Sequence, residues 1–166
     1  MFIGYTKAVL KLLYSTHMEN FYTADKKLIG WARTLSLPLA RTALFVVYTW
    51  FGLLKVFGLS PATPLVEQLF LQTIPAIDFS TFIVLFGLFE TAIGVLFLIK
   101  GAERVVILLL TLHLATTVLP LFLLPVVTWS GPFVPTLEGQ YIIKNLLIIA
   151  TALAVAAHLH PMKKGR

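Results

Sequence analysis

The sequence predicts an all-α integral membrane protein, a four-transmembrane-helix bundle that follows an N-terminal interfacial amphipathic segment. Its 166 residues are 58% hydrophobic and only 12% charged, whereas soluble domains carry about 25% charged residues. Four apolar stretches lie at about 38–59, 79–99, 104–124 and 141–159. Each holds about 20 residues, enough for a helix of roughly 30 Å, the thickness of the hydrocarbon core of a bilayer.

The N-terminal segment 1–36 differs from the four stretches because lysines interrupt its apolar residues. Such an amphipathic pattern is typical of helices that lie in the membrane interface, and Trp31 is suited to anchor one there. We therefore divide the chain into this segment, a four-helix membrane domain at 37–160 and a basic tail at 161–166.

The connections between the stretches predict how the helices are joined. Proline-rich loops follow the first and third stretches, and the apolar run between Pro64 and Pro75 indicates a short helix at the membrane surface. The Lys100-Gly101 turn is tight, so the second and third helices should be antiparallel neighbours. Trp129 and Tyr141 fit an aromatic belt at the outer interface.

The charges predict the orientation of the chain. Eleven of the 13 Lys and Arg residues lie before the first stretch or at its start, in the second loop, or after the fourth stretch. The positive-inside rule then places both termini in the cytoplasm. An even number of spans, which leaves both termini on one side, agrees with this. Because the positive charges gather at span ends, the net charge of +6 does not indicate nucleic-acid binding.

Polar residues recur within the stretches at intervals of three, four or seven, which places them on one face of each helix. An ionisable group facing lipid costs roughly 2.5–3.5 kcal/mol, so these faces should point into the bundle. The candidate binding residues are Tyr48, Lys55, Glu90, His113, Lys144 and Thr151, and the candidate helix-packing residues are Gly52, Gly87 and Gly94.

Counting residues along each helix gives the depth of these side chains. Tyr48, Glu90, His113 and Thr151 fall in one layer near the middle of the membrane, and we expect Glu90 and His113 to be in contact. The two lysines, Lys55 and Lys144, form a second layer nearer the outer side.

Two interpretations of these residues stay open. In the structural one, the lysines extend toward the outer headgroups and the Glu90–His113 pair only holds helices together. In the functional one, a carboxyl, an imidazole and a phenol line a polar pocket that binds the head of a lipophilic molecule, a quinone or a lipid.

Several kinds of chemistry are not supported by the residues. The chain has no cysteine, so it offers no thiolate nucleophile and no thiolate metal ligand. His113 and His158 lie at different depths, which disfavours a haem between them, and a histidine with one carboxylate is too few ligands for a metal site. We therefore assign no catalytic residue, no metal and no covalently bound cofactor, and leave open whether the chain is an enzyme.

Short motifs resemble those of the DoxX-like membrane proteins, most closely the YkgB/RclC-type branch. The runs are WFGLLK at 50–55, FETAIGVLFLIKG at 89–101 and GQYIIKNLLII at 139–149. The residues that match the pattern position by position are Arg41, Gly52, Lys55, Glu90, Gly94, Lys144 and Asn145. The resemblance covers about residues 37–156 and implies a four-helix bundle in a bacterial inner membrane.

The resemblance also implies an association with quinone-linked redox systems and with defence against oxidative stress. We therefore expect a small accessory subunit of a membrane complex that binds a quinone or lipid, with other membrane subunits or copies of itself as partners. Two alternatives are a stand-alone quinone-linked oxidoreductase component and a proton-coupled transporter or channel that uses Glu90.

Overall fold

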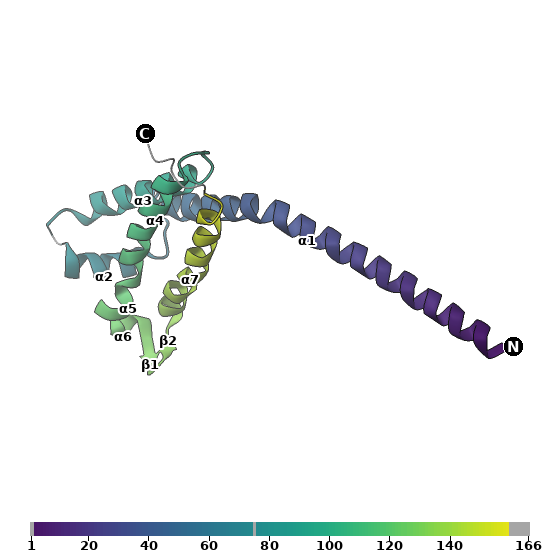
Figure 1. Cartoon of the computed structure of the whole chain (residues 1–166). Coiled ribbons are helices and arrows are strands. Elements are labelled where there is room, and N and C mark those ends of the chain that lie inside the picture. The colour runs from purple at the N-terminus through teal and green to yellow at the C-terminus, as the bar shows by residue number, and fades with distance from the viewer. Residues whose placement is uncertain (1, 75, 160–166) are drawn as a thin grey trace, which may run out of the picture. The chain divides into compact units, whose positions relative to one another are not determined.

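The computed structural model describes residues 2–74 and 76–159, most of which are helical (Figure 1). The helices are α1 (Phe2–Val56), α2 (Thr63–Thr73), α3 (Phe79–Leu96), α4 (Glu103–Val118), α5 (Pro120–Leu123), α6 (Pro125–Thr128) and α7 (Leu137–Ala156), and the strands are β1 (Trp129–Gly131) and β2 (Val134–Pro135).

Four helical segments of this described part of the chain are long and apolar enough to cross a membrane. They run over Phe21–Val56, Phe79–Leu96, Glu103–Leu123 and Leu137–Ala156. The predicted all-α, four-helix membrane bundle is thereby confirmed.

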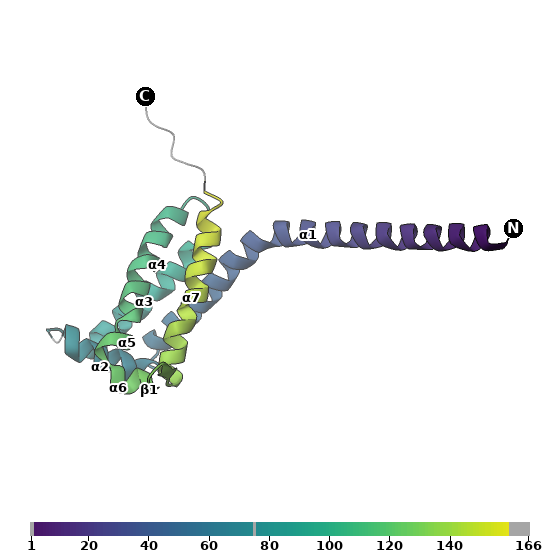
Figure 2. The same cartoon turned by 60° about the horizontal axis from the view of Figure 1, so that its bottom comes forward.

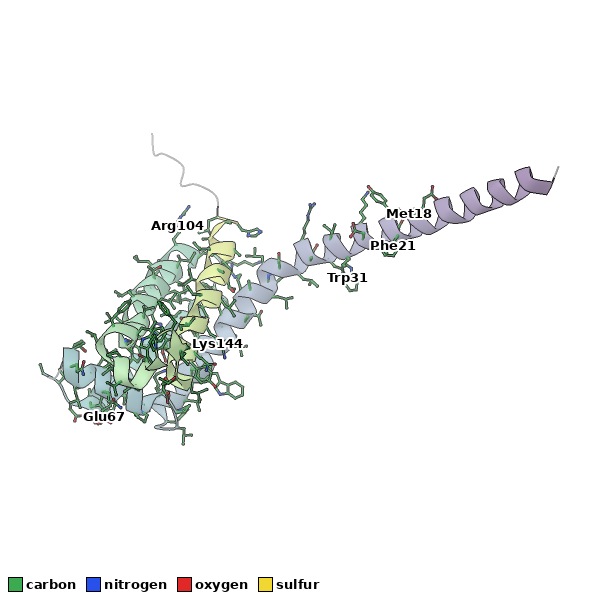
Figure 3. The ribbon with its side chains drawn as sticks, turned by 90° about the horizontal axis from the view of Figure 1, so that it is seen from below. Met18, Phe21, Trp31, Glu67, Arg104 and Lys144 are labelled. Atoms are coloured by element: carbon green, nitrogen blue, oxygen red, sulfur yellow. The ribbon has the colours of Figure 1, made fainter. Side chains whose placement is uncertain are left out.

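The chain divides into two compact units, one that ends at Pro38 and one that begins at Leu39. The first unit is helical, with the side chains of Met18, Phe21 and Trp31 exposed (Figure 3). The N-terminal segment and the first span were predicted as separate elements, but they form one helix, because α1 continues through Pro38. Proline removes one backbone donor, and here the chain stays helical on both sides of it. The interfacial position of the N-terminal segment stays a prediction.

In the second unit, α4 lies beside both α3 and α7 (Figure 2). The side chains that are almost completely shielded between these helices are Ile93, Phe97, Val106, Leu110 and Val155. The large apolar side chains on the outer faces of the helices stay exposed, which is the distribution expected of a bundle whose solvent is lipid. The antiparallel pairing predicted for the second and third spans corresponds to α3 and α4.

Arg41 binds the turn between α3 and α4. Its Nε donates to the carbonyl of Phe97 at 2.7 Å and one terminal nitrogen donates to the carbonyl of Ile99 at 3.1 Å. The other terminal nitrogen lies 2.6 Å from Oε1 of Glu103, whose second oxygen accepts the Gly101 backbone N–H at 2.8 Å. The Ile99 carbonyl also accepts the Ala102 N–H at 3.3 Å. The Phe97 carbonyl lies at the end of α3, where carbonyls lack a partner within the helix, and the guanidinium supplies one.

The opposite end of the bundle holds α2, α5, α6 and the small hairpin (Figure 2). The helix predicted between the first-loop prolines is confirmed as α2, whose Phe70 ring packs 4.7 Å from the Phe82 ring of α3. The third predicted span is formed by α4 and α5, which meet at Pro120. The sequence analysis missed the hairpin, in which β1 pairs antiparallel with β2.

Two helices at this end begin with side-chain caps. The Asp78 carboxylate accepts the Thr81 backbone N–H at 3.0 Å, and the Thr136 hydroxyl accepts the Gly139 N–H at 3.2 Å. Hydrogen bonds from the Ser80 hydroxyl and the Thr81 amide lower the pKa of Asp78, because they favour its charged form. The caps fix where α3 and α7 start and therefore the heights of the side chains within them.

Candidate functional site

Three ionisable side chains meet inside the bundle, which we call the Lys55–Glu90–His113 cluster. Nζ of Lys55 lies 2.5 Å from Oε2 of Glu90, and Nε2 of His113 lies 2.8 Å from Oε1 of the same carboxylate. All three residues are buried, with 5–6% of their surface exposed. The expected contact between Glu90 and His113 is therefore confirmed.

Glycines bring α1 and α3 close enough for the ion pair to form. A Cβ added at Gly52 would lie 2.6 Å from the carbonyl oxygen of Gly87, and one added at Gly87 would lie 2.6 Å from that of Gly52. Gly52 and Gly87 each precede a member of the ion pair by one helical turn or less, so the close approach of the backbones places Lys55 beside Glu90. A Cβ added at Gly94 would likewise lie 2.7 Å from the Thr49 backbone nitrogen. This geometry is what the predicted helix-packing role of the three glycines requires.

Aromatic rings surround His113. The Phe86 ring stacks on the imidazole, with centroids 5.3 Å apart and planes 15° apart, and the Tyr48 ring meets it edge-on at 5.3 Å. The Phe89 ring lies 6.2 Å away. The ammonium of Lys55 lies 5.6 Å from the centre of the Phe86 ring, within the range of a cation–π interaction. Glu90 is thus bound by two nitrogen groups that are themselves shielded by apolar rings.

Burial of this cluster is energetically demanding. Each charge loses its hydration, and a buried ion pair offsets that loss only when its geometry is good and its remaining polar atoms are hydrogen-bonded. Here both oxygens of Glu90 have nitrogen partners and both ring nitrogens of His113 have oxygen partners, the second being Thr117 Oγ1, 3.3 Å from Nδ1. In membrane segments, ionisable groups kept at such cost mark functional sites more often than structural ones.

The Lys55 side chain reaches further toward the middle of the bundle than its position along the helix predicted. Depth counting placed it with Lys144 in an outer layer, but its long side chain reaches the same carboxylate as His113. The count followed backbone positions and took no account of the reach of a lysine side chain. The assignment of Lys55 to a separate layer was wrong.

Lys144 and Thr151 of α7 stand apart from the cluster. Lys144 is exposed, with its ammonium 5.3 Å from the centre of the Tyr141 ring, so the expectation that it faces the bundle interior was wrong (Figure 3). The Thr151 hydroxyl donates to the Leu147 carbonyl of its own helix at 2.7 Å. A lysine near a helix end can place its charge at the membrane surface, which explains why Lys144 needs no buried partner.

Three neighbours of His113 were not among the candidate binding residues. Phe86 and Phe89 are apolar residues in an apolar span, and nothing in their type distinguishes them from ordinary packing residues. Thr117 carried a signal, since it follows His113 by one helical turn and therefore lies on the same face. Among the side chains that the structure describes, no three histidine, aspartate or glutamate residues gather as a metal site would require.

Comparisons with known proteins give no relative for this chain. No family model, no curated protein and no solved structure matches it. The resemblance to DoxX-like proteins therefore stays a prediction from short motifs.

Proposed function

We propose that this chain is a small subunit of a quinone-linked membrane complex and that the Lys55–Glu90–His113 cluster binds the quinone headgroup. One observation carries the proposal: the buried carboxylate of Glu90 is shared by a lysine and a histidine at 2.5 and 2.8 Å, beside an aromatic ring stacked on that histidine. Lysine and histidine nitrogens can donate hydrogen bonds to quinone carbonyl oxygens, and a flat quinone ring can stack on a phenylalanine.

The surroundings of the cluster also suit this ligand. A quinone is a lipophilic molecule that reaches its site through the membrane, and three of the four spanning helices of the described part supply cluster residues or rings, α1, α3 and α4. The chain has no cysteine, so we assign the redox groups that exchange electrons with the quinone to a partner subunit.

We further propose that the protein resides in a bacterial plasma membrane with its termini and the α3–α4 turn in the cytoplasm. The support is the charge distribution, in which 11 of the 13 Lys and Arg residues fall on that side. Arg104, at the start of α4, belongs to this set.

A binding titration tests the quinone site. The purified protein in lipid nanodiscs is titrated calorimetrically with a short-chain benzoquinone, as wild type, as the double variant Lys55→Met/Glu90→Gln and as the control Lys144→Gln. The double variant removes both charges together, so neither is left buried alone. We expect saturable binding by the wild type and the control, and a loss of about tenfold or more in the double variant because charge-assisted hydrogen bonds are lost.

The same samples show how the proposal fails. Equal quinone affinity of the wild type and the double variant would show that the cluster does not bind the quinone. Extraction of a tightly held phospholipid, with no binding of quinone by the wild type, would identify a lipid site instead. Purification from the native membrane in mild detergent tests the subunit assignment, since a chain that elutes without any partner subunit would contradict it.

A further inference from the structure

The two ring nitrogens of His113 face different partners, and these contacts bear on where its protons lie. Nε2 faces Glu90 at 2.8 Å, and Nδ1 faces the Thr117 hydroxyl oxygen at 3.3 Å. Histidine tautomers follow from such hydrogen-bond networks, because each nitrogen either donates or accepts.

Thr117 determines the role of Nδ1. Its hydroxyl oxygen also lies 2.9 Å from the backbone carbonyl oxygen of His113, one turn earlier on α4. A carbonyl oxygen can only accept, and a hydroxyl has one proton, so that proton is used in the bond to the carbonyl. The hydroxyl oxygen then has only lone pairs to offer the ring. This arrangement favours a hydrogen on Nδ1 that is donated to the Thr117 hydroxyl oxygen.

The contact with Glu90 then requires a second proton. With the first proton on Nδ1, an uncharged ring would turn the lone pair of Nε2 toward a carboxylate that also only accepts. A separation of 2.8 Å between two acceptors is stable only when a proton lies between them. Nζ of Lys55 lies 2.5 Å from the other carboxylate oxygen and gives it a cationic hydrogen-bond partner, so we assign this proton to Nε2.

We propose that Glu90 and His113 hold one transferable proton inside the bundle and that Thr117 is the positioning residue that keeps it on the Glu90 side of the ring. As a step that rests on the proposed function, the proton passes to the anionic oxygen of a quinone already reduced by electrons from the partner subunit. The Nε2–H bond breaks, an O–H bond forms on the quinone, and His113 is left neutral with its Nδ1–H retained. No electron moves in this step.

The groups around the ring are consistent with this role. The ionisable side chains against His113 are Glu90 of α3 and Tyr48 of α1, and Lys55 of α1 contacts it through the shared carboxylate. The stacked Phe86 ring covers one face of the imidazole. Among the described contacts of the ring nitrogens, Thr117 and Glu90 are the hydrogen-bond partners, so each nitrogen has one fixed direction for its proton.

Nitrogen NMR of the histidine rings tests the assignment without any quinone. Protein labelled with ¹⁵N-histidine is measured in lipid nanodiscs at neutral pH, and the variant His113→Gln identifies the signals of His113 among the four histidines. We expect a protonated Nδ1 in the wild type. Thr117→Val removes the hydroxyl at nearly constant shape and should change the Nδ1 signal, while Thr117→Ser should restore it.

Thr116→Val is the matched control. Its hydroxyl donates to the same His113 carbonyl at 2.7 Å but has no contact with the ring, so its loss should leave the ring signals unchanged. An unprotonated Nδ1 in the wild type, or a Thr117→Val spectrum identical to that of the wild type, would overturn the proposal. Confirmed ring signals in a protein that binds no quinone would preserve the proton assignment and reject only its delivery to a quinone.

Discussion

At the scale of the residue, the central fact is that one carboxylate serves two nitrogen groups. Glu90 neutralises Lys55 through one oxygen and contacts His113 through the other. Loss of this single side-chain charge would leave the ammonium in an apolar interior with no counter-charge. The cost of such a change is therefore larger than the value of any one contact.

A double-mutant cycle measures that cost. We expect Glu90→Gln alone to lower the free energy of unfolding by about 3–5 kcal/mol, the range for a buried pair that loses one partner. Lys55→Met added to it should recover most of the loss, because the unpaired charge is then gone. Chemical or thermal unfolding in one detergent, followed by circular dichroism, gives both values; additive losses would show that the two side chains do not interact.

The sequence predicted part of this site because residue type and helical spacing carry part of the information. The contact between Glu90 and His113 followed from their equal depth, and the structure confirms it. Depth is counted along each helix axis, so it did not predict that the Lys55 ammonium reaches Glu90. That contact depends on the length of the lysine side chain and on how closely α1 approaches α3. The prediction also failed for Lys144, because spacing alone does not say which face of α7 turns inward.

At the scale of the element, α1 and α3 can cross closely because the residues at the crossing are glycines, which have no side chain. Gly52 and Gly87 each approach the other's backbone so closely that a methyl group has no room. Small residues at such crossings are how membrane helices gain packing contacts without a hydrophobic driving force between them. The ion pair one turn further along depends on the same separation.

Alanine substitution tests the crossing. We expect Gly52→Ala to destabilise the protein by about 1–3 kcal/mol through overpacking and to weaken the Lys55–Glu90 contact by forcing α1 from α3. Gly30→Ala is the control, since nothing lies within 4 Å of a Cβ at that position of the same helix. It should stabilise α1 by about 0.5–1 kcal/mol, the difference in helix propensity between the two residues. Equal melting temperatures for the two variants would refute the tight crossing.

The ends and joints of the elements were predictable where proline or glycine marks them. The helix between Pro64 and Pro75 and the turn at Gly101, with φ of 91°, followed from such signals. The boundary predicted between the N-terminal segment and the first span is not a helix end, because α1 continues through Pro38. The hairpin of β1 and β2 was missed since its strands have three and two residues, too short to show an alternating pattern.

At the scale of the whole molecule, apolar composition determined the fold class, and the charges at the span ends predict its orientation. Four spans with exposed apolar faces indicate that the surroundings of the bundle are lipid. Which side faces the cytoplasm depends instead on a few lysines and arginines outside the spans. Orientation is therefore a separate property from fold and needs its own measurement.

Cysteine labelling in intact cells measures orientation directly, because the chain has no cysteine of its own. Ser130→Cys places a thiol on the hairpin and Ala102→Cys places one in the α3–α4 turn, at opposite ends of the bundle. With a membrane-impermeant maleimide, we expect labelling of the first and protection of the second until the cells are broken open. The reverse pattern would place the termini outside.

Arg41 has a consequence for how the protein is made. Synthesis runs from the N-terminus, so α1 leaves the ribosome long before the Phe97 carbonyl, 56 residues later, and the Glu103 carboxylate exist as partners. During that interval the guanidinium has only water and lipid phosphates to bind, which keeps the part of α1 around Arg41 at the membrane surface. Insertion of the α3–α4 hairpin then supplies two carbonyls and a carboxylate at once. The arrival of that hairpin is thus also the moment at which the first helix is fixed to the rest of the bundle.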